Sequence, residues 1–521
     1  MARSGGRAGP QLTAQQPARP VMELLLVAAA GGLQTIAFVH TQAWWLQLAC
    51  CGFLAWRVAR QASAGRAALL GAAYGAAWMW AGVWWLHVSM HRYGGMPAWL
   101  SALSVVAFGA FLSLFLALAL VLFARCRSGE PLRDALRFGA FWLLAELGRG
   151  VALTGFPWLA SGYAHVDSPL ASLAPWVGVY GVGAVGATLA AWSVFAIMQC
   201  RSRWRGVAAG ALVLGVLALL GPMRFTEPTG TLSVTLLQGN VDQSDKFSAK
   251  KQGGALAWHM HALTTARTDV VIAPETAIPF LPKEMPADFW PVIDQRFATG
   301  TTHAVFGLPL GNEGTGYSNS AIALAPGRPH YRYDKHHLVP LGEFTPIGMR
   351  WFKRLLDLPL GELNAGPARS PAFVVHGERL AMSICYEQLF GEELALRFAN
   401  AADEPTMLVN LGNIAWFGDT EAMQQDLQIA RMRSLEFERP MLRAANTGAT
   451  VVIDHRGKVA YALPAHVQGQ LEAKVQGRTG MTPYAWWASA FALWPLFALA
   501  LLPVLALVPS LRPARAAVSG R

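Results

Sequence analysis

Charged residues are scarce in this sequence, and lysine is absent until Lys246. Asp, Glu, Lys and Arg make up 14% of the 521 residues, whereas hydrophobic residues make up 54%. A soluble globular domain usually contains about 25% charged residues. The low charge therefore excludes a chain made only of soluble domains and indicates a membrane protein with a polar portion.

Cysteine is also rare, and the motifs of common cofactor sites are missing. The five cysteines and the histidines show no zinc-type spacing, and there is no P-loop. We therefore predict no metal and no cofactor. The net charge of +11 would suit a nucleic-acid partner, but the basic residues fall between apolar segments. Orientation in a bilayer explains them better, so no nucleic-acid partner is expected.

Apolar segments separated by short loops fill residues 1 to about 228. Segments of about 17–25 apolar residues are long enough to cross a bilayer. The sequence predicts about eight spans, at 22–39, 42–57, 67–89, 98–124, 134–152, 176–199, 206–221 and 485–509. The second and the seventh of these spans are the shortest.

Arginines are concentrated in alternate loops of this region. They precede the first span, follow the eighth, and separate spans two and three, four and five, and six and seven. Because cytoplasmic loops are enriched in Lys and Arg, both termini are predicted to be cytoplasmic. The segment between spans seven and eight then lies on the opposite side of the membrane. In a bacterium with an inner and an outer membrane, that side is the periplasm.

The composition changes at Thr226–Gly230, where β-rich runs such as "TLSVTLLQGN" and "RLAMSICYE" begin to alternate with helical patterns at 283–299, 391–400 and 420–438. Strands interleaved with helices predict an α/β domain beside the membrane helical bundle. The predicted parts are a basic cytoplasmic tail (1–20), a seven-span membrane domain (21–228), a periplasmic domain (229–478), and a last span with a cytoplasmic tail (479–521).

Three residues of the polar domain are candidates for chemistry. Cys385, in "SICYEQLF", is the only cysteine of this domain, so it is either a buried strand-end residue or a nucleophile. Glu275, in "VIAPETAIPF", follows an apolar strand and is either a general base or a capping carboxylate. Lys335, in "YRYDKHHLVPLGEFTP", either stabilises an oxyanion or belongs to a solvated basic loop.

The order Glu275, Lys335, Cys385, with each residue after a β-rich run, resembles the nitrilase, or carbon–nitrogen hydrolase, superfamily. The resemblance covers roughly 230–478. It implies a four-layer αββα sandwich in which these three residues form a Glu-Lys-Cys catalytic triad.

Further segments are similar to the apolipoprotein N-acyltransferase family: "WLHVSMHRYGGMPAWL", "FWLLAELGRG", "LTGFPWLASGYAH", "LLQGNVDQSDKF", "KHHLVPLGEFTP" and "AWFGD". This resemblance implies two-step acyl transfer through a thioester on Cys385. The donor would be a membrane glycerophospholipid, and the acceptor the α-amine of the diacylglyceryl-cysteine of an apolipoprotein. Phe247 and Ile414 depart from the family, which commonly has tryptophan and a polar residue there.

The same resemblance implies supporting roles around the triad. Glu343 and Glu387 would hold Lys335 or order the nearby backbone, and Tyr386 would be a close neighbour of the thiol. Trp416 and Phe417 either line a groove for the acyl chain or pack in an aromatic core.

Glu146 and Arg149 lie near the end of the fifth predicted span. Charges in a membrane segment often mark function, but the simpler expectation is that these two pair with each other or lie at the interface. We assign neither a catalytic role.

Two other functions fit parts of the pattern. A membrane-tethered amidase would use the same triad with water as the acyl acceptor. A non-catalytic membrane sensor would leave Cys385 dispensable. The transmembrane segments favour the lipid donor, and we expect a monomer in the bacterial inner membrane.

Overall fold

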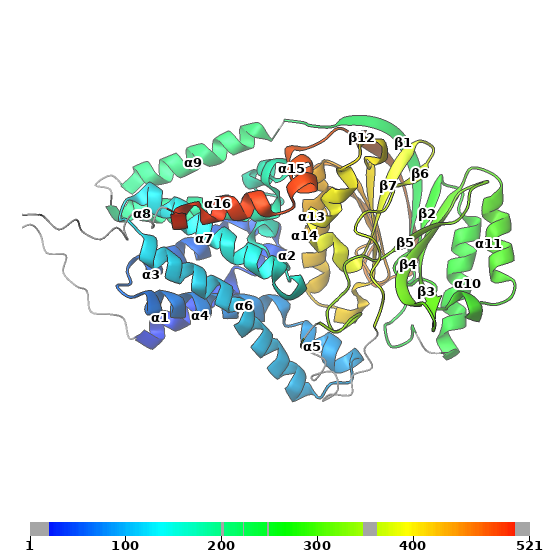
Figure 1. Ribbon diagram of the computed structural model, residues 1–521, viewed down its shortest axis with the longest axis horizontal. Helices are drawn as coiled ribbons and strands as arrows, with labels where there is room; N and C mark the ends of the chain where they lie inside the picture. Colours follow the sequence, from blue (N-terminus) through cyan, green and yellow to red (C-terminus); the bar gives the residue numbers. More distant parts are fainter. Residues whose placement is uncertain are drawn as a thin grey trace, which may run out of the picture.

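A helical bundle and a pair of β-sheets form the two ends of the protein in the computed structural model (Figure 1). The structure describes residues 20–199, 203–221, 223–246, 249–346, 348 and 362–505. Phe247, nearly all of the predicted tail 1–20 and the C-terminal residues 506–521 lie outside the described residues.

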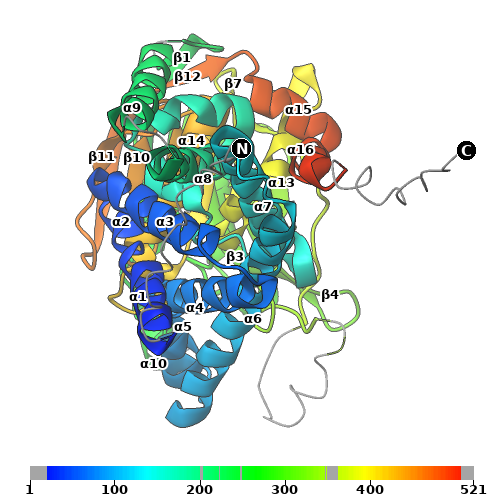
Figure 2. The ribbon, with the colours of Figure 1, turned by 90° about the vertical axis from the view of Figure 1, so that its left-hand side faces the viewer.

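The bundle is built from the apolar segments of the sequence, with α8 in the middle (Figure 2). Its helices are α1 (Pro20–Leu33), α2 (Ile36–Val39), α3 (Trp44–Ala59), α4 (Ala64–Val83), α5 (Leu86–Val88), α6 (Ala98–Cys126), α7 (Pro131–Val151), α8 (Ala174–Gln199), α9 (Arg203–Leu220), α15 (Pro483–Phe491) and α16 (Trp494–Leu505). Shorter turns are η1 (Thr41–Ala43), η2 (Ser89–Tyr93), η3 (Ala152–Thr154), η4 (Ser161–His165) and η5 (Pro169–Leu173).

The number of membrane spans is not confirmed, although each predicted span lies mostly on helix where the structure describes it. In the described chain three helical segments are long and apolar enough to cross a bilayer: Pro20–Val39, Ala98–Cys126 and Pro169–Met198. A fourth is added if α15 and α16 count as one broken span. By this measure α3, with 16 residues, is too short, and α7 includes Arg, Asp and Glu. In α9 only Gly210–Leu220 counts as an apolar helix, and this part is too short as well.

The predicted last span is bent rather than straight. The axes of Pro483–Phe491 and Trp494–Pro503 differ by 91°. Ala492, between the two helices, has φ of 48°, which lies outside the right-handed helical region. The helix therefore cannot continue through this residue, which hydropathy alone did not reveal.

The polar domain contains two six-stranded sheets packed face to face. The first, in the order β12-β1-β2-β3-β4-β5, contains β1 (Glu227–Gln238), β2 (Val270–Ile272), β3 (His303–Asn312), β4 (Gly316–Leu324), β5 (Tyr331–Asp334) and β12 (Gly469–Thr479). The second, in the order β11-β10-β9-β8-β7-β6, contains β6 (Phe373–Val375), β7 (Glu378–Ile384), β8 (Met407–Gly412), β9 (Met441–Ala445), β10 (Val451–Ile453) and β11 (Val459–Ala462).

Helices cover the outer face of each sheet. Apolar residues of both sheets, such as Ile272 and Val409, form one buried cluster between them. The first sheet packs against α10 (Ala249–Thr265) and α11 (Phe289–Ala298), and the second against α13 (Gly391–Ala395) and α14 (Ala422–Phe437). Short helices η6 (Pro282–Glu284), η7 (Cys385–Leu389), η8 (Leu396–Phe398), η9 (Ala401–Asp403) and η10 (Ile414–Phe417) complete the domain. The layers follow the order αββα, as the resemblance implied.

Helix α14 lies between the second sheet and the bundle (Figure 1) and is polar on its buried faces. The side-chain amide of Gln425 accepts hydrogen bonds from the indoles of Trp85 (3.2 Å) and Trp158 (2.7 Å) and donates one to the carbonyl of Gly82 (3.0 Å). Buried polar groups are costly without partners. These bonds therefore fasten the two-sheet domain to the helical bundle.

Candidate active site

Cys385 occupies a strained turn at the end of a central strand. It follows β7 directly and begins η7, with φ of 53°, a left-handed backbone that is uncommon for residues other than glycine. Such strain tends to persist at functional positions. The residue as a whole is half-buried.

The structure brings Glu275 and Lys335 to the same place. Glu275 follows β2, Lys335 follows β5, and their side chains are 9% and 1% exposed. The ammonium of Lys335 lies 3.5 Å from one carboxylate oxygen of Glu275. Both charges act on the thiol of Cys385. The three residues predicted from the sequence therefore meet in one site.

The electrostatics of the site fix the resting protonation states. Burial raises the pKa of Cys385 well above its ordinary value, Glu275 raises it further, and Lys335 opposes the rise. Burial alone would lower the pKa of Lys335, but Glu343 and Glu275 raise it above its ordinary value. At neutral pH the site therefore holds a neutral thiol beside an ammonium ion.

Glu343 and Asn319 hold the two charged partners of the cysteine. The carboxylate of Glu343 accepts a hydrogen bond from Lys335 at 3.0 Å. The side-chain amide of Asn319, on β4, donates to Glu275 at 2.7 Å and to Glu343 at 2.8 Å. Asn319 was missed at the sequence level, where its only signal was an amide inside the β-rich run "SNSAIALA".

Glu387 does not touch Lys335 but orders the backbone on both sides of the site. Its carboxylate accepts hydrogen bonds from the backbone N–H of Ile384 (2.6 Å) and of His336 (2.7 Å). Ile384 precedes Cys385 and His336 follows Lys335 in the chain. One buried side chain therefore joins the turn of the cysteine to the segment of the lysine.

A backbone donor, also missed from the sequence, faces the sulfur. The N–H of Asn413, directly after β8, hydrogen-bonds to Cys385 and favours its charged form. The side chain of Asn413 is bonded to Gln243 at 2.9 Å and to Asn446 at 3.1 Å. The adjacent Ile414, where the family commonly has a polar residue, is buried in the apolar cluster shared with the bundle.

Tyr386 connects the active-site turn to the membrane bundle. Its hydroxyl donates a hydrogen bond of 3.1 Å to the carbonyl of Gly155, in the loop between α7 and α8. Tyr386 and Glu387 thus hold the turn after Cys385 from two sides, one through the bundle and one through the polar domain.

The two aromatic residues of η10 differ in exposure. Phe417 is half-buried, with its ring centroid 4.3 Å from that of Trp85, so it packs against the bundle. Trp416 is 39% exposed and meets Tyr93 edge-on at 6.0 Å. Of these two residues, Trp416 alone has an exposed apolar face that an acyl chain could cover.

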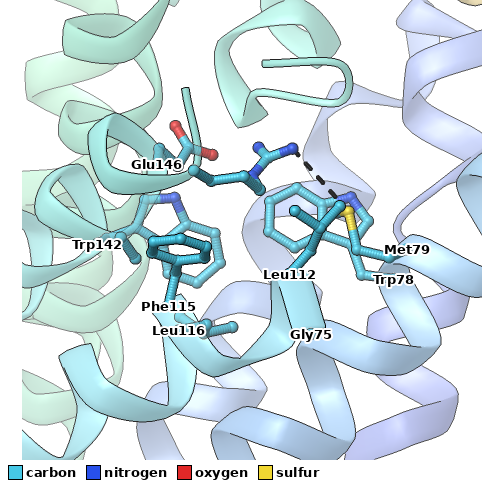
Figure 3. A pocket seen from close by; sticks show the side chains of 10 residues that line it. Gly75, Trp78, Met79, Leu112, Phe115, Leu116, Trp142 and Glu146 are labelled. Atoms are coloured by element: carbon cyan, nitrogen blue, oxygen red, sulfur yellow. Dashed lines mark hydrogen bonds between the residues drawn. The ribbon is translucent and has the colours of Figure 1, made fainter. Parts of the chain in front are cut away.

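Glu146 and Arg149 do not form a direct pair, which was one of the two arrangements expected from the sequence. In the described part of the bundle, Glu146 accepts the backbone N–H of Ser161 at 2.7 Å. Arg149 donates to the carbonyls of Phe156 (3.2 Å) and Trp158. Both residues fasten the loop that carries Gly155, and they line a bundle pocket together with Trp78, Met79 and Trp142 (Figure 3).

The histidines beside Lys335 are engaged in local contacts. His336 Nδ1 lies 2.8 Å from the carbonyl of Gly366, and His337 Nδ1 lies 2.9 Å from Glu393. Across the described residues, no group of three His, Cys, Asp or Glu side chains is placed to hold a metal ion.

Comparison with known proteins agrees with this arrangement. Residues 30–192 match the family described as the apolipoprotein N-acyltransferase N-terminal domain, and residues 233–484 match the carbon-nitrogen hydrolase family. The chain is 47% identical to the apolipoprotein N-acyltransferase of Verminephrobacter eiseniae over 476 residues, covering 86% of this chain and 89% of that protein. It is 44% identical to that of Ralstonia nicotianae, covering 90% of each.

A third relative, the apolipoprotein N-acyltransferase of Bordetella bronchiseptica, is 40% identical over 510 residues, covering 88% of this chain and 92% of that protein. These similarities extend over both the membrane helices and the two-sheet domain. A helical N-terminal region joined to a carbon–nitrogen hydrolase fold, with Cys385, Glu275 and Lys335 in one site, is thus accounted for by common descent: the chain belongs to the apolipoprotein N-acyltransferase family.

Proposed function

We propose that this protein transfers a fatty acyl group from a membrane glycerophospholipid to the α-amine of the diacylglyceryl-cysteine that begins an apolipoprotein. The observation that carries the proposal is the grouping of Cys385, Glu275 and Lys335 in one buried site. The bond from Tyr386 to Gly155 joins this site to the membrane bundle. The family name supports N-acyl transfer to an apolipoprotein.

In the first step the sulfur of Cys385 attacks the ester carbonyl of the phospholipid. Because the thiol is neutral at rest, its proton passes to Glu275 as the C–S bond forms. Lys335 stabilises the oxyanion of the tetrahedral intermediate. When the C–O bond breaks, Glu275 returns the proton to the leaving alcohol oxygen, and a lysophospholipid departs from the thioester.

In the second step the amine of the apolipoprotein attacks the thioester. An α-amine has a pKa of about 7.7–8.0, so an appreciable fraction is neutral at pH 7. Glu275 accepts the proton that the nitrogen loses and delivers it to the sulfur as the C–S bond breaks. The amide is less reactive than the thioester, which makes the transfer favourable.

The membrane bundle allows the acyl chain to remain in lipid. Removing an acyl chain from the bilayer costs about 0.8 kcal/mol per CH₂ group. A site bonded to the bundle avoids most of this cost. The exposed ring of Trp416, beside the bundle residue Tyr93, is placed to cover part of the chain.

The proposed topology is eight crossings of the bacterial inner membrane by segments within 21–228 and 479–521, with domain 229–478 in the periplasm and both termini in the cytoplasm. The arginines of alternate loops support it. Arg57 and Arg66 both bind Glu23, at 2.6 and 2.9 Å, and Arg127 donates to the carbonyl of Gln61 at 2.7 Å. These loops therefore share one end of the bundle, as a common cytoplasmic side requires.

A thioester should form without any acceptor. When the purified protein is incubated with a dipalmitoyl glycerophospholipid alone, the peptide that carries Cys385 should gain the mass of one palmitoyl group in mass spectrometry. Hydroxylamine should remove the group, since it cleaves thioesters. The peptide that carries Cys126 serves as the control. A Cys385 peptide that remains unmodified while the complete reaction proceeds contradicts the covalent mechanism.

The orientation can be tested with reporters at the C-terminus. A fusion after Arg521 is expected to show a cytoplasmic reporter as active and a periplasmic reporter as inactive. A second fusion, in the exposed turn at Glu313 between β3 and β4, should give the reverse result. Periplasmic activity of the Arg521 fusion would overturn the topology.

A further inference from the structure

The negative charge of the active site exceeds the charge of Lys335. Two carboxylates, Glu275 and Glu343, contact this one ammonium ion. When the thiol proton of Cys385 moves to Glu275, the negative charge passes to the sulfur and its amount is unchanged. In a poorly solvated site an unbalanced charge is costly, so the geometry calls for a second cation.

Lys246 lies where such a cation is needed. It belongs to the segment between β1 and α10 and is 5% exposed. Its ammonium donates a hydrogen bond of 3.0 Å to the backbone carbonyl of Glu275. The described residues offer this ammonium no other hydrogen-bond acceptor, so it has two N–H groups to spare beside the small pocket that it lines with Glu275, His259 and Asn446.

The segment that carries Lys246 is fixed to the rest of the active site. Asn446 donates to the carbonyl of Val241 at 2.7 Å and to the side chain of Asn413 at 3.1 Å. Asn413 in turn donates to Gln243 at 2.9 Å. Because the backbone N–H of Asn413 faces the sulfur of Cys385, one network positions this donor and the segment of Lys246 together.

We propose that Lys246 is a positioning residue for the acyl transfer: it holds Glu275 by its backbone carbonyl and offsets the negative charge on Glu275 and then on Cys385. This role rests on the proposed function and adds to it a group outside the Glu-Lys-Cys triad.

The charge state of Lys246 suits this role. Burial lowers its pKa to about 8, whereas the charge of Glu275, and that of Cys385 once it is ionised, raise it. Lys246 is therefore mainly protonated at pH 7. The other titratable group that faces it is His259 of α10, whose pKa is lowered to about 4 by burial and which is neutral at that pH. Around the sulfur, the remaining charges are those of Lys335 and Asp426.

The test measures the thiol itself, without lipid. In Lys246→Met the rate of iodoacetamide alkylation of Cys385 in the full-length detergent-solubilised protein should fall about tenfold at pH 7, where the parent Lys246 is mainly charged, as expected for a pKa of Cys385 raised by one unit. Lys246→Arg should retain the parent rate within about threefold, because the charge is kept. Lys251→Met, at a lysine that pairs with Asp245 on the surface, is the matched control and should equal the parent.

A second readout does not depend on a neutral variant being stable. In the parent, the increase of the alkylation rate with pH should become shallower near pH 8, where Lys246 loses its proton, and Lys246→Arg should remove this bend. Overlapping pH profiles of the parent and Lys246→Met, or a bend that persists in Lys246→Arg, would overturn the proposal. Failure of the acyl transfer itself would appear separately, as a missing palmitoyl adduct on parent Cys385.

Discussion

Replacement of Cys385 by alanine is expected to lower the rate of N-acyl transfer at least about 10⁴-fold, because the covalent route through the thioester is lost. Alanine keeps the β-carbon, so the turn with φ of 53° changes little and the protein should remain folded. Activity is measured as the mass of an N-acylated lipopeptide formed from phospholipid and a diacylated lipopeptide.

Two further variants separate the nucleophile from the fold. Cys126→Ala, at the end of α6, removes a thiol outside the site and should retain activity. Cys385→Ser should be nearly as inactive as the alanine variant, since a serine hydroxyl is much harder to deprotonate than a thiol. Cys385→Ala with more than about one hundredth of the parent turnover would refute the assignment of the nucleophile.

Much of the catalytic end of the molecule was predictable because its signals are local. Glu275, Lys335 and Cys385 each follow a strand that the pattern of apolar residues revealed. The ends of these strands meet in the folded domain, as the resemblance implied. The element types followed from the same periodicity, which depends only on residues near one another in the chain. The αββα order of the layers was implied by the resemblance.

The groups that hold and polarise the three candidate catalytic residues were not predictable, because they belong to segments distant in the sequence. Asn319, on β4, donates to the carboxylate of Glu275. Lys246, in the segment that follows β1, donates to the backbone carbonyl of Glu275. Asn413 acts through a backbone N–H, which every residue except proline carries. A single sequence gives no reason to choose one amide or lysine over its neighbours.

In the bundle, local reasoning did not identify the hydrogen-bond partners of two buried charges. Glu146 and Arg149 are three residues apart on α7, a spacing that favours pairing on an isolated helix. The loop after α7 folds back instead, and its backbone groups take both side chains. Apolar length likewise predicted helices well but could not show the 91° bend between α15 and α16.

The turn after Cys385 joins these two parts of the protein. Tyr386 is bonded to the loop that Arg149 holds, and Glu387 is bonded to the segment of Lys335. A change in the bundle can therefore reach the cysteine through one side chain and one loop. This continuity gives the helical bundle a physical connection to the sulfur of Cys385.

Replacement of Glu275 by glutamine is expected to slow acyl transfer about 10²–10⁴-fold, the usual contribution of a general base. Glutamine has the same shape, and its carbonyl oxygen can still accept the hydrogen bond from Asn319. It cannot accept the proton of the thiol or of the incoming amine. The rate of palmitoyl adduct formation on Cys385 and the rate of lipopeptide acylation should both fall.

The same substitution should have the opposite effect on the free thiol. The negative charge of Glu275 raises the pKa of Cys385, so its removal lowers that pKa and should accelerate iodoacetamide alkylation at a given pH. Slower acyl transfer together with faster alkylation identifies a lost base, whereas a distorted site would slow both. Glu313→Gln, in the exposed turn between β3 and β4, should change neither rate. If acyl transfer by Glu275→Gln matched that of the parent, the proton acceptor would have to be another group.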